Sequence, residues 1–221
     1  MSKRILMIVT SHSRIDDTHE TGIWFEEFSV PYNRFLQQGY AVTVMSPAGG
    51  DAPLDANSLA EYQATEDNER AQAALKGLPA LNDSVQANNY DAVFFPGGHG
   101  TMFDLPDNPH VQRLIQDFYS AGKPVASVCH GPACLVNVSS EGVSLVKGRK
   151  VTAFTDSEER VVQLDQVMPF LLETRLRELG AVFVPADDWA DNTIVDGHLI
   201  TGQNPQSSGS AAEAMIKLLE D

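Results

Sequence analysis

The sequence predicts one doubly wound α/β domain, in which a mostly parallel, flavodoxin-like sheet is covered by helices on both faces. Short apolar runs rich in β-branched residues alternate with amphipathic segments of about 10 to 15 residues, which is typical of parallel strands joined by helices. No linker rich in Pro, Ser or Gly and no internal repeat divides the 221 residues. We therefore treat residues 1–221 as a single domain.

The first half of the chain opens with an apolar run at 5–9, which predicts a buried strand. A helix is expected over 22–38, with Pro31 inside it predicting a kink or a break. A second strand follows at 40–45. Residues 51–89 are polar and acidic, and we expect them to form an excursion with one or two short helices.

The alternation of strands and helices returns after residue 89. We expect strands at 90–95, 124–128, 150–154, 181–184, 193–195 and 199–201, and helices at 108–121, 167–179 and 207–219. A glycine-rich turn fills 96–106. Parallel sheets place their chemistry at the carboxyl ends of the strands, so the polar loops after Val9, Phe95, Val128 and Phe154 are the expected location of a site.

Charge and composition exclude several classes of protein. The chain has 30 acidic and 15 basic residues, for a formal charge of −15, and such a surface repels both nucleic acid and anionic lipid. The apolar run near the start is too short for a signal peptide or a membrane span. With only two cysteines, a disulfide framework is not expected, and we predict a cytoplasmic protein with free thiols.

The segment PVASVCHGPA takes a strand directly into a predicted helix at Cys129. A sharp strand-to-helix turn exposes its apex side chain, as in nucleophile elbows, and the small residues Ser127 and Gly131 flank this cysteine. A helix N-terminus favours an anion, which predicts a lowered pKa for the thiol and a reactive thiolate. The alternative is a small buried hydrophobe, which is the interpretation favoured for Cys134.

Candidate acid–base groups lie on three segments. His130 is a possible base beside the thiol. A buried glutamate near the cysteine would have a raised pKa and could hand a proton to the thiolate, although a solvated helix face is the alternative. A further carboxylate could orient His130. The candidates are Glu26 and Glu27 in the first helix, and Asp156, Glu158 and Glu159 after the strand at 150–154.

The run PGGHG at 96–100 follows another predicted strand. Glycines allow backbone amides to approach a ligand closely, and such amides could stabilise a developing oxyanion. An ordinary turn is the alternative. No lysine follows in the spacing of a phosphate-binding loop, so a nucleotide site is not expected.

Four motifs, in order, resemble the ThiJ/PfpI superfamily, which has a class I glutamine-amidotransferase-like fold. They are PGGHGTMFDLPDNP, VCHGPA, AFTDSEE and VMPFLLETRLRELGA, and the resemblance runs from about residue 4 to residue 219. The cysteine followed by histidine, the GGHGT turn and the segment TGIWFEEFSVPY are most similar to the heat-shock chaperone and glyoxalase III branch.

This resemblance implies a set of site residues and a homodimer without a cofactor or a metal. Glu27 matches the carboxyl partner because it stands six residues after Thr21, and Glu159 matches the acidic member that follows Phe154. The implied catalytic residues are Cys129, His130, Glu27 and Glu159, and the implied oxyanion and substrate-binding positions are Gly98, His99 and Gly131.

The activity implied by the resemblance is a glutathione-independent glyoxalase. Its partner is a small reactive dicarbonyl: methylglyoxal and water would become lactate through a hemithioacetal on Cys129. The alternatives are a cysteine amidase, peptidase or deglycase, and a stress chaperone or cysteine redox sensor. Glutaminase activity is not expected, since the only late histidine, His198, has no acid two residues after it.

Overall fold

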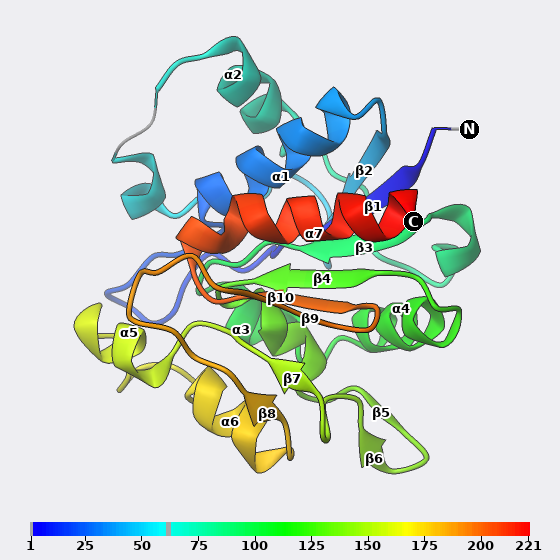
Figure 1. Cartoon of the computed structure of the whole chain (residues 1–221). Helices are drawn as coiled ribbons and strands as arrows, with labels where there is room; N and C mark the ends of the chain where they lie inside the picture. The colour runs from blue at the N-terminus through cyan, green and yellow to red at the C-terminus, as the bar shows by residue number, and fades with distance from the viewer. Residues whose placement is uncertain (1, 61–62) are drawn as a thin grey trace.

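A computed structural model of the protein describes residues 2–60 and 63–221. Within them lies a six-stranded sheet of order β2-β1-β3-β4-β10-β9, in which every neighbouring pair is parallel except β10 and β9 (Figure 1). Its strands are β1 Arg4–Ile8, β2 Ala41–Met45, β3 Ala92–Phe95, β4 Val125–Val128, β9 Thr193–Asp196 and β10 Leu199–Gly202. The predicted fold class is confirmed.

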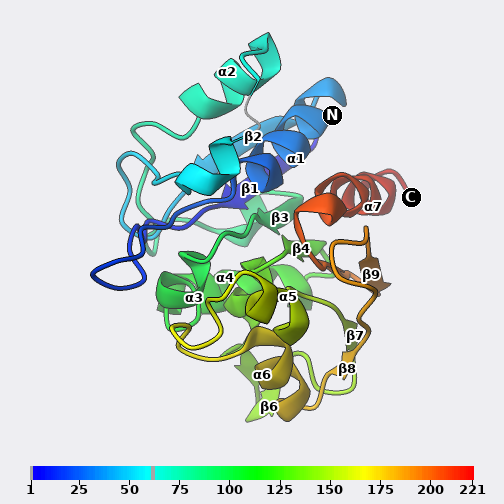
Figure 2. The ribbon, with the colours of Figure 1, turned by 90° about the vertical axis from the view of Figure 1, so that its left-hand side faces the viewer.

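Helices cover both faces of this sheet (Figures 1 and 2). The α-helices are α1 Phe25–Gln37, α2 Glu66–Ala73, α3 Thr101–Asp104, α4 Pro109–Ser120, α5 Asp156–Val161, α6 Leu172–Glu178 and α7 Ser208–Glu220. The 3-10 helices are η1 Ala56–Leu59, η2 Ala87–Asn89, η3 Gly131–Leu135 and η4 Pro205–Ser207. Helices α1, α2 and α7 lie on one side of the sheet, and α4 lies on the other.

Two adjacent phenylalanines on β3 show how the core is divided. Successive strand residues point to opposite faces. Phe94 belongs to the apolar cluster under α1 and α7, where it packs edge-to-face on Phe35 at 5.8 Å between ring centroids. Phe95 belongs to the cluster under α4, together with Leu114 and Phe118. Both phenylalanines are fully buried, so β3 is a central strand covered on both faces.

The structure corrects several expectations about the first half of the chain. Helix α1 runs through Pro31 without a break and continues to Gln37. The glycine-rich turn at 96–106 contains the short helix α3. The excursion at 51–89, of which residues 61–62 lie outside the described residues, carries the expected short helices. Asn33 of α1 accepts a hydrogen bond from Arg70 of α2, which ties the excursion to the domain.

The second half differs more. The strand expected at 150–154 is only β7 Lys150–Val151, which pairs with β8 Val182–Phe183 away from the main sheet. Helix α6 begins at Leu172 rather than at 167, because a proline disfavours helical backbone in the residue before it, here Met168. The hairpin β5 Ser139–Ser140 and β6 Val143–Ser144 and the helix α5 were not among the predicted elements.

No helix in the described part of the chain combines the length and the apolar character needed to cross a bilayer.

Cys129 occupies the apex of a tight turn after β4. Its backbone has a φ of 60°, which is unusual for a residue other than glycine. The amide of Cys129 donates to the carbonyl of Gly202 at the end of β10, and its carbonyl accepts the amide of Phe154, at 2.9 Å in each case. Neighbouring segments thus hold the strained conformation in place. The helix predicted to follow is the short 3-10 helix η3.

Gly131 gives this turn the clearance it needs. A Cβ placed on Gly131 would overlap the carbonyl oxygen of Phe95 in the neighbouring strand. Because backbone atoms of a central strand cannot move aside easily, any side chain at this position would displace η3 or the apex.

We therefore expect Gly131→Ala to destabilise the fold by about 1 to 3 kcal/mol through overpacking. The matched control is Gly209→Ala in α7, where the nearest atoms belong to the flexible side chain of Arg34 and alanine improves helix propensity by about 1 kcal/mol. Urea denaturation of both variants measures the difference. Equal stability of the two variants would contradict the close packing at Gly131.

Candidate active site

His130 links the apex cysteine to a buried carboxylate. Its Nδ1 lies 3.4 Å from Sγ of Cys129, and its Nε2 lies 2.7 Å from Oε2 of Glu159. Burial works against ionisation of Glu159, but the adjacent His130 and His99 outweigh it and hold the pKa of this carboxyl below its usual range. An ionised carboxylate only accepts hydrogen bonds, so Nε2 of His130 must carry the proton. Nδ1 is then a lone-pair acceptor facing the thiol.

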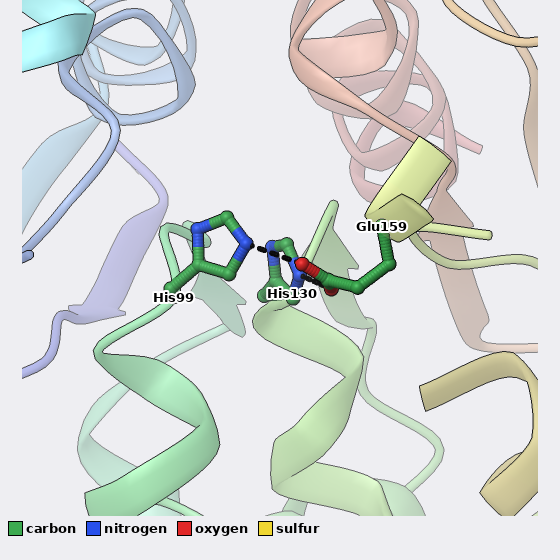
Figure 3. A group of neighbouring side chains, drawn as sticks. All are labelled: His99, His130 and Glu159. Atoms are coloured by element: carbon green, nitrogen blue, oxygen red, sulfur yellow. Dashed lines mark hydrogen bonds and ion pairs between the residues drawn. The ribbon is translucent and has the colours of Figure 1, made fainter. Parts of the chain in front are cut away.

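His99 binds the other oxygen of the same carboxylate. Its Nε2 lies 2.8 Å from Oε1 of Glu159, and its ring lies 4.0 Å from that of His130 between centroids (Figure 3). The sequence prediction gave His99 only a backbone role, so this side-chain contact was missed. The histidine in the GGHG run was the available signal, but the sequence did not show that the turn faces Glu159.

The same three side chains have the composition of a metal site. One ligand atom from each of His99, His130 and Glu159 lies within 4.8 Å of the others. Both ring N–H groups, however, already point at the two carboxylate oxygens. The cluster is therefore complete as a hydrogen-bonded unit, and a cation would have to displace the carboxylate from between the rings.

The neighbouring residue Glu158 anchors the helix that carries Glu159. Its Oε1 accepts hydrogen bonds from the Trp189 amide and from the side chains of Gln203 and Asn204, and its Oε2 accepts from Thr155. These donors fix the first turn of α5 against the end of β10. Before the family resemblance selected Glu159, sequence reasoning treated Glu158 as one of three candidates, because only the fold shows which carboxylate faces these donors.

Glu27 reaches the cysteine from α1 and is fully buried, whereas Glu26 is exposed. Burial raises the pKa of Glu27 to about 8, which the interactions with Cys129 and with the Gly97 amide offset only in part. Oε2 accepts the Gly97 amide at 2.8 Å. Oε1 makes no well-aligned hydrogen bond within the described residues. A proton on Glu27 is therefore available to the sulfur or to a substrate oxygen.

The expectation of a lowered thiol pKa is wrong. Burial raises the pKa of Cys129 well above its ordinary value, and the negative charge of Glu27 raises it further. The physical reason is that η3 is a short 3-10 helix with little dipole to offer, while acidic groups surround the sulfur. Burial, with the nearby His99, also lowers the pKa of His130. The resting pair is a neutral thiol beside a neutral imidazole.

The glycine turn lies directly against the elbow. Thr101 donates from its hydroxyl to the carbonyls of Gly98 at 2.8 Å and His130 at 3.0 Å, which joins the two loops. Gly98 has a φ of 100° and packs on the backbone of Gly22 and Trp24. Within the part of the chain described, the amides of Gly98 and His99 donate no backbone hydrogen bond. They are free to serve as the predicted oxyanion donors.

A cavity of about 430 Å³ opens beside His99. Its walls come from the loop after β1, from the start of the 51–89 excursion and from the segment after α5. The lining includes the apolar Ile15, Trp24 and Leu164 and the acidic Glu20 and Asp55. The excursion thus contributes to the wall of this cavity.

Glu27→Gln should change how stability depends on pH. The folded pKa of Glu27 is about 8 and its ordinary value is 4.5. Between these values the folded chain holds a proton that the unfolded chain releases. Rising pH therefore weakens the folded state, by at most about 1.4 kcal/mol per pH unit. Because Glu27→Gln removes this titration, its free energy of unfolding relative to the parent should increase with pH across that window.

Urea denaturation near pH 5 and near pH 7.5 measures this change, and Glu26→Gln, at the exposed neighbour, is the matched control. A stability difference between Glu27→Gln and the parent that stays constant with pH would show that Glu27 does not hold a buried proton.

The sequence of this chain is similar to those of several known proteins. The model of the DJ-1/PfpI family matches residues 21–218. The "Glutathione-independent glyoxalase hsp3101" of Schizosaccharomyces pombe is 36% identical, with 97% of this chain and 95% of that protein covered. The "Glyoxalase 3" of Candida albicans is 31% identical, with 98% of each chain covered.

Solved structures of similar proteins have the same fold. The crystal structure of glyoxalase III from Candida albicans superposes with a TM-score of 0.89 at 31% identity, covering 97% of this chain and 96% of that chain. The Rapid Encystment Protein 24 KDa of Francisella tularensis gives a TM-score of 0.92 at 35% identity, covering 98% and 99%. The resemblance inferred from the four sequence motifs is confirmed, and the chain belongs to the DJ-1/PfpI family.

Proposed function

We propose that this protein is a glutathione-independent glyoxalase that converts methylglyoxal and water to lactate. One observation carries the proposal: a buried thiol lies 3.4 Å from Nδ1 of an imidazole and also interacts with a carboxyl whose pKa is raised. The relatives named as glyoxalases, which match over nearly the whole chain, support the same conclusion.

The first step generates the nucleophile when it is needed. Nδ1 of His130 takes the thiol proton as Sγ of Cys129 bonds to the aldehyde carbon, C1. The carbonyl electron pair moves onto oxygen, where the amides of Gly98 and His99 can stabilise it. Glu27 then protonates this oxygen, which gives a neutral hemithioacetal. Glu159 stabilises the imidazolium that forms and keeps its orientation.

The remaining steps isomerise and release the product. A base removes the proton from C1, and the electron pair forms a C1–C2 double bond with negative charge on the C2 oxygen. Glu27, ionised by the previous step, could supply this base, and so could His130 once its proton has passed to Glu27. Protonation at C2, with transfer of the C1 hydroxyl proton to the C2 oxygen, gives a thioester. Water then releases lactate and restores the thiol.

Burial of the sulfur favours a small substrate. Cys129 is only 4% exposed, so a free aldehyde can approach it more easily than a peptide amide on a folded protein. The raised pKa of the thiol also makes spontaneous peroxide oxidation slow, because the thiolate is the reactive form. Both features support the glyoxalase over the amidase and redox-sensor alternatives.

The late histidine has no part in this site. The carbonyl of His198 accepts the amide of Val125 at the start of β4, and its ring lies near Gly122. Both contacts are at the amino-terminal edge of the sheet, opposite the cysteine. This position supports the expectation that glutaminase chemistry is absent.

Purified protein should produce lactate from methylglyoxal without glutathione and in the presence of a chelator. Cys129→Ala should reduce the rate at least about a hundredfold, because the covalent step is lost. Cys134→Ala is the matched control, since Cys134 is buried in a different apolar cluster from the one that contains Cys129, and it should retain the parent rate. Lactate formation that survives Cys129→Ala would refute the proposed chemistry, and faster turnover of a peptide amide by the parent would favour an amidase.

We also expect a homodimer in the cytoplasm, on the strength of the family resemblance alone. Light scattering on protein eluted from a size-exclusion column should give a mass of about twice the chain mass of 24.0 kDa. A mass of one chain would contradict this expectation.

A further inference from the structure

The carboxylate of Glu159 supports two imidazoles in the same way, yet the proposed chemistry uses only one of them. Nε2 of His130 and Nε2 of His99 bind separate oxygens of Glu159, at 2.7 and 2.8 Å (Figure 3). Both rings are buried, with His130 at 1% and His99 at 7% exposure. A carboxylate that orients a catalytic imidazole therefore orients a second one equally well.

The free nitrogen of His99 faces a different environment from that of His130. Because Glu159 can only accept, Nε2 of His99 carries a proton, and Nδ1 has a lone pair whenever the ring is neutral. Figure 3 shows Nδ1 of His99 directed away from the carboxylate. Among the described residues Nδ1 has no hydrogen-bonding partner, and His99 lines the 430 Å³ cavity. Nδ1 of His130, in contrast, is engaged with the sulfur.

His99 lies next to the imidazole that contacts the sulfur. The ring of His99 packs on that of His130 at 4.0 Å between centroids and forms part of the adjoining cavity wall. It is therefore suited to act on the carbon atoms, while His130 serves the sulfur.

We propose that the side chain of His99 is a second catalytic acid–base group, which carries the proton from C1 to C2 of the hemithioacetal. This proposal rests on the proposed glyoxalase function. Nδ1 takes the C1 proton as the C–H electron pair forms the C1–C2 double bond and the C2 oxygen becomes negative. The resulting imidazolium is stabilised by Glu159. Nδ1 then returns the proton to C2, while the C1 hydroxyl proton passes to the C2 oxygen, which leaves a neutral thioester and a neutral imidazole.

Two substitutions separate catalysis from positioning. In His99→Gln, the amide N–H can still donate to Glu159, but the side chain cannot carry a proton at neutral pH. His99→Phe removes both functions. We expect both variants to lose about a hundredfold or more in kcat for lactate formation. His99→Gln should keep the parent rate of Cys129 alkylation by iodoacetamide within about threefold, because the Glu159–His130–Cys129 connection is intact.

Each other result is decisive. If the parent is active and His99→Gln has the same kcat, the acid–base role is overturned, since a hydrogen bond to Glu159 would then be enough for full activity. Parallel loss of kcat and of alkylation rate in His99→Gln would also overturn it and leave His99 as a positioning residue. A parent that makes no lactate from methylglyoxal would overturn the proposed function itself. If His99→Phe does not fold, His99→Gln alone still distinguishes these results.

Discussion

The site depends on one buried carboxylate that accepts hydrogen bonds from two histidines. Glu159 sets which nitrogen of His130 carries the proton, and this alone makes Nδ1 an acceptor for the thiol. A negative charge at such depth is tolerable only because N–H donors satisfy both oxygens. The carboxylate is aimed by α5, whose first turn is fixed by the hydrogen bonds that converge on Glu158. The position of Glu159 therefore depends on the contacts between α5 and the segment that follows β10.

The electrostatics of the site oppose a permanently ionised cysteine. Burial and acidic neighbours raise the pKa of the Cys129 thiol, and Glu27 holds a proton for the same reason. In a chain with a formal charge of −15, a resting thiolate would add one more negative charge to an already negative cluster. Because Glu27 and Cys129 are both protonated at rest, this added charge is avoided. The thiol then ionises only when its sulfur donates an electron pair to the substrate.

Sequence periodicity was sufficient for the strands of the central sheet and for the turn that bears Cys129, because β-branched runs and small residues reflect local conformation. Glu27 was selected only through the family resemblance, since helical spacing did not separate it from Glu26. It failed where tertiary contacts decide. The short β7, the start of α6 and the donors around Glu158 depend on segments distant in sequence. The predicted lowering of the Cys129 pKa was wrong, because the burial of the thiol and the charges around it became known only with the fold.

The tautomer of His130 tests this account most directly. Nitrogen-15 NMR of histidine-labelled protein at neutral pH distinguishes the two neutral tautomers and the imidazolium. The structure predicts a neutral His130 with its proton on Nε2 and a bare Nδ1 facing the sulfur. A proton on Nδ1, or a doubly protonated ring, would leave the thiol without an acceptor and would contradict the account.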